Sequence, residues 1–84
     1  MKPIFAELAW EDYLYWQQVD KKIVKRINEF IAATTRDPFS GIGKPEPLKY
    51  ALAGYWSRRV TEADRVVYKA EGGSLLIAQL RYHY

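Results

Sequence analysis

One segment divides this sequence into two halves of different character, and it limits the folds open to the chain. Residues 37–48, "DPFSGIGKPEPL", contain three prolines and two glycines. Proline lacks a backbone N–H and glycine favours turns, so this segment predicts a loop without regular structure. Before it, apolar residues recur every three or four positions, whereas after it they alternate. We therefore expect helices followed by strands within one small domain, residues 1–84.

The first half predicts a short strand and two helices. The stretch "KPIF" can begin a strand, and Pro3 places it at a strand start or at a sheet edge. The aromatic and aliphatic spacing from Ala6 to Gln18 suits a helix. Asp20 suits the N-cap of a second helix, because its carboxylate can accept hydrogen bonds from the first backbone N–H groups. An apolar stripe along this second helix predicts its core face: Ile23, Ile27, Phe30, Ile31 and Thr34.

The second half predicts three antiparallel strands. Their sequences are "GYWSRRVT", "RVVYKA" and "SLLIAQLRYH", and the connections are "EAD" and "EGG". The element order is then β-α-α-β-β-β. This order predicts an α+β fold in which a helical hairpin packs on one face of a small antiparallel sheet.

The register between strands decides which side chains share a face of the sheet. If both connections are three-residue loops, Thr61 lies opposite Arg65 and Ala70 lies opposite Ser74. One face is then apolar, with Val66, Tyr68, Ala70, Leu76, Ala78 and Leu80. The opposite face carries Ser57, Arg59, Arg65, Gln79, Arg81 and His83. A two-residue turn at "EGG" would mix these faces and bring Tyr84 to the second one, but either register places the chain end beside the arginines.

Composition excludes several kinds of site. Of the 84 residues none is cysteine and one is histidine, which excludes disulfides, thiolate nucleophiles and multi-histidine metal sites. We expect no metal and no cofactor. Acidic residues interrupt the apolar N-terminus and no apolar run approaches membrane-spanning length, so we expect a cytoplasmic protein without membrane contact. The net charge of +3 arises wholly within residues 36–84, which indicates an anionic partner for that half.

Four residues suit acid–base cleavage of RNA by its own 2′-hydroxyl. That reaction needs a base for the hydroxyl proton, cations for the charge of the phosphorane, and an acid for the departing 5′-oxygen. Glu46 can be the base, and the prolines on either side restrict its backbone. Arg65 with Arg59 can bind the phosphate, and His83 can be the acid. Three further cations are candidate RNA-binding residues: Lys44, Lys49 and Arg81.

Each of these residues also has an ordinary structural explanation. Glu46 can be a surface carboxylate of the loop, and a terminal His83 is often partly buried or disordered. The two arginines can form ion pairs within their own hairpin, with Glu62 and Asp64. Composition alone therefore does not favour catalysis.

Five segments carry a resemblance to a known family: "DYLYW", "DKKIVKRINE", "KPEPLK", "GYWSRRVTEADRVVY" and "RYHY". In this order, and across essentially the whole chain, they resemble the YoeB toxins of the bacterial RelE/ParE toxin–antitoxin superfamily. The resemblance implies the RelE/ParE fold, which is similar to that of microbial RNases. It also implies a toxin of a type II toxin–antitoxin system that is a ribosome-dependent mRNA endonuclease, which cleaves mRNA in the ribosomal A site and needs no metal.

The resemblance also assigns roles and partners. Glu46 is implied as the base, Arg65 with Arg59 as the phosphate ligands, and His83 as the acid, with Tyr84 as a positioning residue at the end of the chain. The implied partners are a YefM-type antitoxin, the 70S ribosome with its mRNA, and a second copy of the chain in a homodimer.

Two other functions remain open. A toxin of the same fold, as in the ParE branch, can poison DNA gyrase by binding without cutting. A general basic RNA-binding module would instead show strong salt dependence and no cleavage. The nuclease is favoured because a protein that only binds does not need the complete set of Glu46, Arg59, Arg65 and His83.

Overall fold

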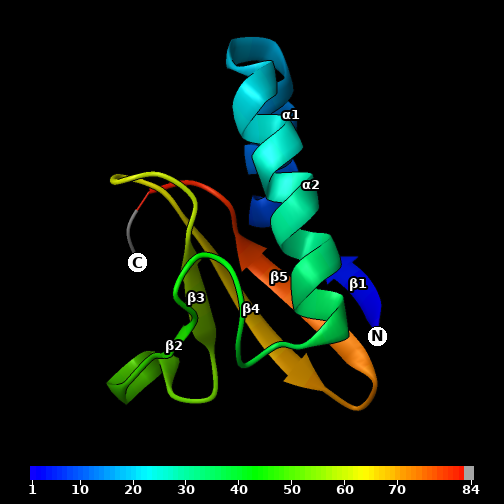
Figure 1. Ribbon diagram of the computed structural model, residues 1–84, viewed down its shortest axis with the longest axis vertical. Coiled ribbons are helices and arrows are strands. Elements are labelled where there is room, and N and C mark those ends of the chain that lie inside the picture. Colours follow the sequence, from blue (N-terminus) through cyan, green and yellow to red (C-terminus); the bar gives the residue numbers. More distant parts are fainter. Residues whose placement is uncertain (83–84) are drawn as a thin grey trace.

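Two helices cover one face of a five-stranded sheet in the computed structural model, which describes residues 1–82 (Figure 1). This arrangement confirms the predicted α+β class and the helical hairpin. The elements in chain order are β1 (Lys2–Phe5), α1 (Glu7–Val19), α2 (Lys21–Arg36), β2 (Glu46–Pro47), the 3-10 helix η1 (Tyr50–Leu52), β3 (Trp56–Arg59), β4 (Arg65–Glu71) and β5 (Ser74–Gln79).

The sheet is mixed, with the strand order β1-β5-β4-β3-β2. The pairs among β3, β4 and β5 are antiparallel, as predicted, and β2 also pairs antiparallel with β3, but β1 pairs parallel with β5. The prediction of a wholly antiparallel sheet is therefore wrong. Alternating apolar residues indicate that a strand exists, but they do not indicate the direction in which it pairs. Pro3 does lie in an edge strand, where a missing N–H is tolerated.

The second helix follows its sequence pattern closely. Oδ1 of Asp20 accepts hydrogen bonds from the backbone N–H groups of Lys22 and Ile23, at 3.0 and 3.4 Å, which confirms the N-cap. Ile27 and Phe30 of the apolar stripe are buried against the sheet. The stripe therefore packs into the core, as periodicity predicts.

The first helix divides its apolar residues between the core and the surface. Its buried residues are Ala9, Asp12 and Trp16. Four large apolar side chains stay exposed on the same helix: Leu8, Trp10, Leu14 and Val19. Within residues 1–82, neither helix is long and apolar enough to cross a membrane.

The connection between β3 and β4 is longer than predicted. Arg59 lies opposite Arg65, so residues 60–64 form the loop. Oγ1 of Thr61 donates to Oδ2 of Asp64 at 3.0 Å and closes it. Because the pairing differs from the predicted one by two residues, the two arginines still share a face of the sheet, as expected.

The connection between β4 and β5 is shorter than predicted. Glu71 lies opposite Ser74, so Gly72 and Gly73 alone form the turn. Their φ angles are 57° and 78°, a left-handed conformation that glycine adopts without strain and that suits a two-residue hairpin.

This shorter turn reverses the faces of β5. Leu75 and Ile77 are fully buried in the core, whereas the predicted core residues Leu76 and Ala78 are only partly buried. That part of the predicted register is therefore wrong, because a change of one residue exchanges the two faces. A β-bulge farther along the pair shifts the register again, so Leu80 returns to the core as predicted.

The proline-rich segment contains regular structure after all. Glu46 and Pro47 form the edge strand β2 and pair with Ser57 and Trp56 of β3. The prediction of a loop without regular structure is wrong here, because an edge strand tolerates a proline that donates no hydrogen bond. The pairing places the backbone of Glu46 directly beside β3.

A buried arginine holds the rest of this loop on the sheet. Arg58 is 0% exposed, and its guanidinium donates to the carbonyl oxygens of Asp37 at 2.6 Å, Ser40 at 2.9 Å and Ile42 at 3.0 Å. Nε of Arg58 also donates to the Tyr68 hydroxyl at 3.2 Å. Hydrogen bonds from a charged donor are the stronger ones, so this single side chain fixes the loop that leads into β2.

Gly43 brings the same loop against α2 and β3. A Cβ at this position would lie 2.5 Å from a ring carbon of Phe30, and the φ of 81° is also unfavourable for other residues. The carbonyl oxygen of Gly43 accepts a hydrogen bond from the backbone N–H of Arg59 at 2.7 Å. The loop is therefore attached to β3 just before it enters β2.

Replacing Arg58 should lower the urea concentration at which the protein unfolds much more than replacing its neighbour Arg59. Arg58→Lys replaces a guanidinium whose three nitrogens donate to four acceptors by a single ammonium nitrogen, and we expect a loss of about 3 kcal/mol in unfolding free energy. Arg59→Lys, at an exposed position, should change it by less than about 0.5 kcal/mol. Urea denaturation at one protein concentration measures both, and equal stability of the two variants would contradict the role of Arg58.

Candidate active site

The candidate base and a candidate phosphate ligand are in direct contact. The side chain of Arg65 is 9% exposed, whereas that of Glu46 is 50% exposed. Nη1 of Arg65 donates to Oε1 of Glu46 at 2.9 Å and to Oγ of Ser57 at 3.1 Å. Three adjacent strands, β2, β3 and β4, supply these residues. The sheet therefore holds a buried cation against a carboxylate that reaches the solvent.

A second cation lies beside this pair. Arg59 is exposed and is the cross-strand partner of Arg65. Directly opposed side chains of an antiparallel pair have Cβ atoms about 5 Å apart. Two guanidinium groups on one face suit a phosphate, because each can donate two parallel hydrogen bonds to its oxygens.

Just after β5, both backbone groups of Leu80 form hydrogen bonds with side chains of α1. The N–H of Leu80 donates to Oδ2 of Asp12 at 3.0 Å, and the carbonyl oxygen of Leu80 accepts from the indole N–H of Trp16 at 2.9 Å. Asp12 and Trp16 are four residues apart, so they lie on the same face of the helix. This clamp fixes the direction in which the chain leaves the sheet.

Two residues later the chain is bound to the start of β4. The N–H of Tyr82 donates to Oδ1 of Asp64 at 2.7 Å, and the carbonyl oxygen of Tyr82 accepts from the N–H of Arg65 at 3.2 Å. Figure 1 shows this segment, in red, running from β5 toward the loop between β3 and β4. The candidate acid His83 and the candidate positioning residue Tyr84 lie outside the described residues.

Asp64 of the β3–β4 hairpin accepts hydrogen bonds from groups other than the arginines considered from the sequence. Asp64 accepts hydrogen bonds from the hydroxyl of Thr61 and from the backbone of Tyr82. Arg65 forms its ion pair with Glu46. The hairpin carboxylate thus organises the loop and the chain end, and the arginine faces β2.

The three candidate RNA-binding cations have different surroundings. Lys49 lines a surface hollow that also contains Glu46, while Lys44 and Arg59 line another hollow together with Arg26 of α2. Arg81 packs against two rings, with its guanidinium carbon 3.4 Å from the ring centre of Tyr15 and 4.4 Å from that of Tyr82. Lys49 therefore lies near Glu46 and Lys44 near Arg59, while Arg81 packs against the rings of Tyr15 and Tyr82.

Backbone strain is concentrated around these residues. Among the described non-glycine residues, positive φ occurs at Lys44, Tyr50 and Tyr82, with values of 51°, 57° and 67°. Lys44 and Tyr50 stand shortly before and after Glu46, and Tyr82 precedes His83. Left-handed backbone is unfavourable for such side chains and is found most often at functional sites.

Two residues that position the site carry no sequence motif. Asp12 and Trp16 lie in the first helix, far from the other candidates in sequence, and are joined to them only by the fold. The available signal is the helical spacing of four residues, which puts a carboxylate in line with the buried face. Burial raises the pKa of Asp12, and the Leu80 N–H and the charge of Arg81 oppose that rise.

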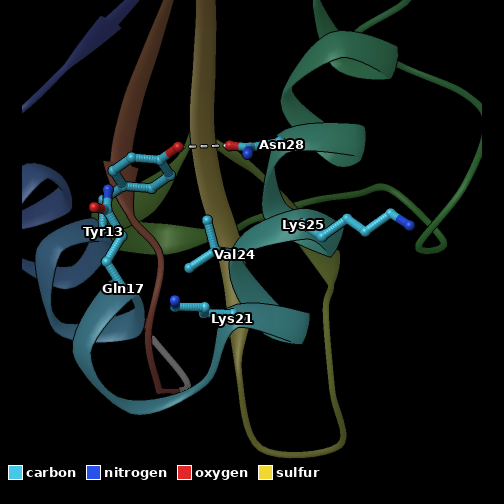
Figure 2. Close-up of a pocket in the computed structure, with 6 residues that line it drawn as sticks. All are labelled: Tyr13, Gln17, Lys21, Val24, Lys25 and Asn28. Atoms are coloured by element: carbon cyan, nitrogen blue, oxygen red, sulfur yellow. Dashed lines mark hydrogen bonds between the residues drawn. The ribbon is translucent and has the colours of Figure 1, made fainter.

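A separate hollow lies between the two helices. Figure 2 shows Tyr13 and Asn28 pointing toward one another across it, and the Tyr13 hydroxyl donates to Oδ1 of Asn28 at 2.7 Å. Lys25 extends away from the other labelled side chains. The hollow contains none of the candidate residues. Within residues 1–82, no group of three His, Cys, Asp or Glu side chains could hold a metal ion.

Comparison with known proteins assigns the chain to a family. Residues 5–84 match the family described as YoeB-like toxins of bacterial type II toxin–antitoxin systems. The chain belongs to this family. It is 62% identical to the toxin YoeB of Escherichia coli K12 over 84 residues, which is the full length of both chains. The chain is therefore a YoeB-type toxin of a type II toxin–antitoxin system.

Solved structures of YoeB toxins share this fold over its full length. The YoeB dimer from Staphylococcus aureus is 46% identical, with a TM-score of 0.92, and the match covers 100% of this chain and 98% of that one. A toxin in a heterotetrameric YoeB–YefM complex from the same organism is also 46% identical, with a TM-score of 0.91 and the same coverage.

The raised pKa of Asp12 predicts how stability changes with pH. The folded state binds the proton of Asp12 more tightly than the unfolded state does. Protonated Asp12 therefore adds to the unfolding free energy below about pH 4, and this stabilisation is lost as the pH rises through the folded pKa. Asp12→Asn keeps an oxygen acceptor for Leu80 but has no charge. The unfolding free energy of Asp12→Asn should therefore rise relative to that of the wild type between pH 4 and pH 7. Urea denaturation measures both.

Asp37 provides a control of opposite sign. The Ser40 hydroxyl and the Phe39 N–H lower its pKa, so its contribution is present above about pH 4 and is lost as the pH falls. Asp37→Asn should therefore lose stability relative to the wild type as the pH rises toward about 4, and its curve should run parallel to that of the wild type from pH 4 to pH 7. Parallel curves for Asp12→Asn and the wild type would contradict the account of Asp12.

Proposed function

We propose that this toxin is a ribosome-dependent endoribonuclease that cuts mRNA in the ribosomal A site by attack of the 2′-hydroxyl. The observation that supports it most is the contact between the half-exposed carboxylate of Glu46 and the buried guanidinium of Arg65. Arg59 lies across from that arginine, and the chain end is bound to the same strand. These contacts support the roles of Glu46 as base and of Arg65 and Arg59 as phosphate ligands.

The proposed reaction uses protein side chains throughout. Glu46 takes the proton of the 2′-hydroxyl while the oxygen attacks phosphorus. Arg65 and Arg59 bind the non-bridging oxygens as the pentacoordinate phosphorane gains charge. His83 donates a proton to the departing 5′-oxygen, and Tyr84 positions the substrate. The bond between phosphorus and the 5′-oxygen breaks, which leaves a 2′,3′-cyclic phosphate and a 5′-hydroxyl without any metal.

The ribosome would supply orientation that this small site lacks. Glu46 stands half-exposed on a two-residue edge strand, so little of the protein surrounds a substrate there. In-line attack requires the 2′-oxygen, the phosphorus and the leaving oxygen to be held in one line, and such alignment lowers a barrier strongly. Lys44, Lys49 and Arg81 would add contacts to the RNA backbone. This dependence also places the protein where ribosomes are, in the cytoplasm.

The proposed protein partners are a YefM-type antitoxin and a second copy of the chain. The structural relatives from S. aureus are a YoeB dimer and a YoeB–YefM heterotetramer. This chain exposes four large apolar side chains on α1 that suit such contacts: Leu8, Trp10, Leu14 and Val19.

A translated mRNA with one 2′-deoxy nucleotide tests the chemistry. We expect the wild-type toxin to cut the all-ribose message on translating ribosomes and to leave a 2′,3′-cyclic phosphate or a 3′-phosphate. A 2′-deoxy substitution at the scissile position should block that cut, because the attacking oxygen is missing. Primer extension and end-group analysis measure both. Cleavage that survives the deoxy substitution would rule out the proposed mechanism.

A further inference from the structure

Tyr50 has a backbone conformation that its side chain does not favour. It begins η1 with a φ of 57°, in the left-handed region that glycine and asparagine occupy far more readily. Bulky residues in this region occur mainly where the surrounding structure imposes the conformation. The fold therefore bears a cost at this position that a smaller residue would avoid.

The Tyr50 side chain does not offset this backbone strain with interactions inside the fold. It is 93% exposed, the most exposed of the large apolar or aromatic side chains described. Its hydroxyl has no hydrogen-bond partner among residues 1–82, and its ring takes part in no aromatic pair there. Neither packing nor hydrogen bonding within the chain explains a tyrosine here.

The turn that carries this ring is rigid. The N–H of Leu52 donates to the carbonyl oxygen of Lys49 at 3.2 Å, and the N–H of Ala53 donates to that of Tyr50 at 3.0 Å. On either side of the turn, the N–H of Leu48 donates to the carbonyl oxygen of Tyr55 at 2.9 Å, and the Leu48 side chain is buried. The ring is thus presented on a fixed base.

The same ring borders the candidate site. Tyr50 lines a surface hollow whose other walls include the carboxylate-bearing Glu46 and the cation Lys49. A single-stranded RNA held with its phosphate at Arg65 would bring neighbouring bases to this surface. Unpaired bases stack on exposed aromatic rings, and this contact accepts every base because each has a π-face.

We propose that Tyr50 is a stacking platform for one nucleobase of the RNA substrate, next to the phosphate that is cut. The inference rests on the proposed function, because it assumes an RNA strand at Glu46 and Arg65. Lys49 binds the phosphate of the stacked nucleotide, and the ring sets the position of that nucleotide relative to Glu46. Tyr50 is therefore a substrate-binding residue of the nuclease.

Three variants separate the ring from the backbone. Tyr50→Phe keeps the ring and should cut mRNA on programmed ribosomes much faster than variants that lack the ring. Tyr50→Gly and Tyr50→Asn remove the ring and accept the left-handed backbone, so their Tm should equal or exceed that of the wild type. Both should nevertheless lower kcat/KM about tenfold or more, the size expected for one lost base stack. A purely structural role cannot give higher stability together with lower activity.

An abasic nucleotide identifies the stacked base. Single abasic sites are placed one at a time on either side of the scissile bond of a translated message. At one position the abasic site should lower the cleavage rate of the wild type about as much as Tyr50→Gly lowers it on the intact message. The same abasic site should not lower the cleavage rate of Tyr50→Gly any further. If the effects of Tyr50→Gly and of the abasic site on the cleavage rate multiply at every position, the proposal is overturned.

The remaining outcomes also decide. If Tyr50→Gly cuts like the wild type while cleavage stays sensitive to 2′-deoxy substitution, the stacking proposal fails and the proposed function stands. If the wild type cuts no message, both fail. If Tyr50→Gly shows a smaller mass in light scattering and dilution of the wild type reproduces its loss, the ring contacts a second copy of the chain and the stacking proposal is overturned.

Discussion

The buried guanidinium of Arg58 is the interaction on which the candidate site most depends. Its hydrogen bonds to three carbonyl oxygens of the loop after α2, and to the Tyr68 hydroxyl, join that loop to the sheet. The loop continues through Gly43 into β2, and this places Glu46 against Arg65. A carboxylate on an untethered loop would lose conformational entropy each time it met its partner. Here that entropy is removed by folding.

The candidate site draws its residues from the sheet and from the segments attached to it. Strands β3 and β4 supply the arginines, while an edge strand and the chain end supply the remaining candidates. The end is held at Leu80 by α1 and at Tyr82 by β4, so a segment that would otherwise fray is directed toward Arg65. The residues with strained backbone stand at these same attachments, where a stable core can support unfavourable conformations.

Much of the fold followed from local patterns, and the exceptions have physical causes. The Asp20 cap and the apolar stripe of α2 are local, and both were predicted correctly. The parallel direction of β1 and the register of β5 depend on long-range pairing and on a glycine turn, which alternation does not determine. Alternation does put Arg58 and Arg59 on opposite faces, but only the loop carbonyls reveal which arginine is structural. Asp12 is linked to the site by its hydrogen bond from the Leu80 N–H, a contact between residues far apart in the sequence.

The most direct test of the account is primer extension on a translated message, with the wild-type toxin compared to His83→Gln. If the chain end supplies the general acid, the wild type produces new 3′ ends at the ribosomal A site and the variant produces them at least about 100-fold more slowly. The variant should keep its fold and its binding of the antitoxin. Cleavage by His83→Gln at the wild-type rate would contradict the account, and undiminished toxicity with DNA damage would instead favour a gyrase-binding toxin.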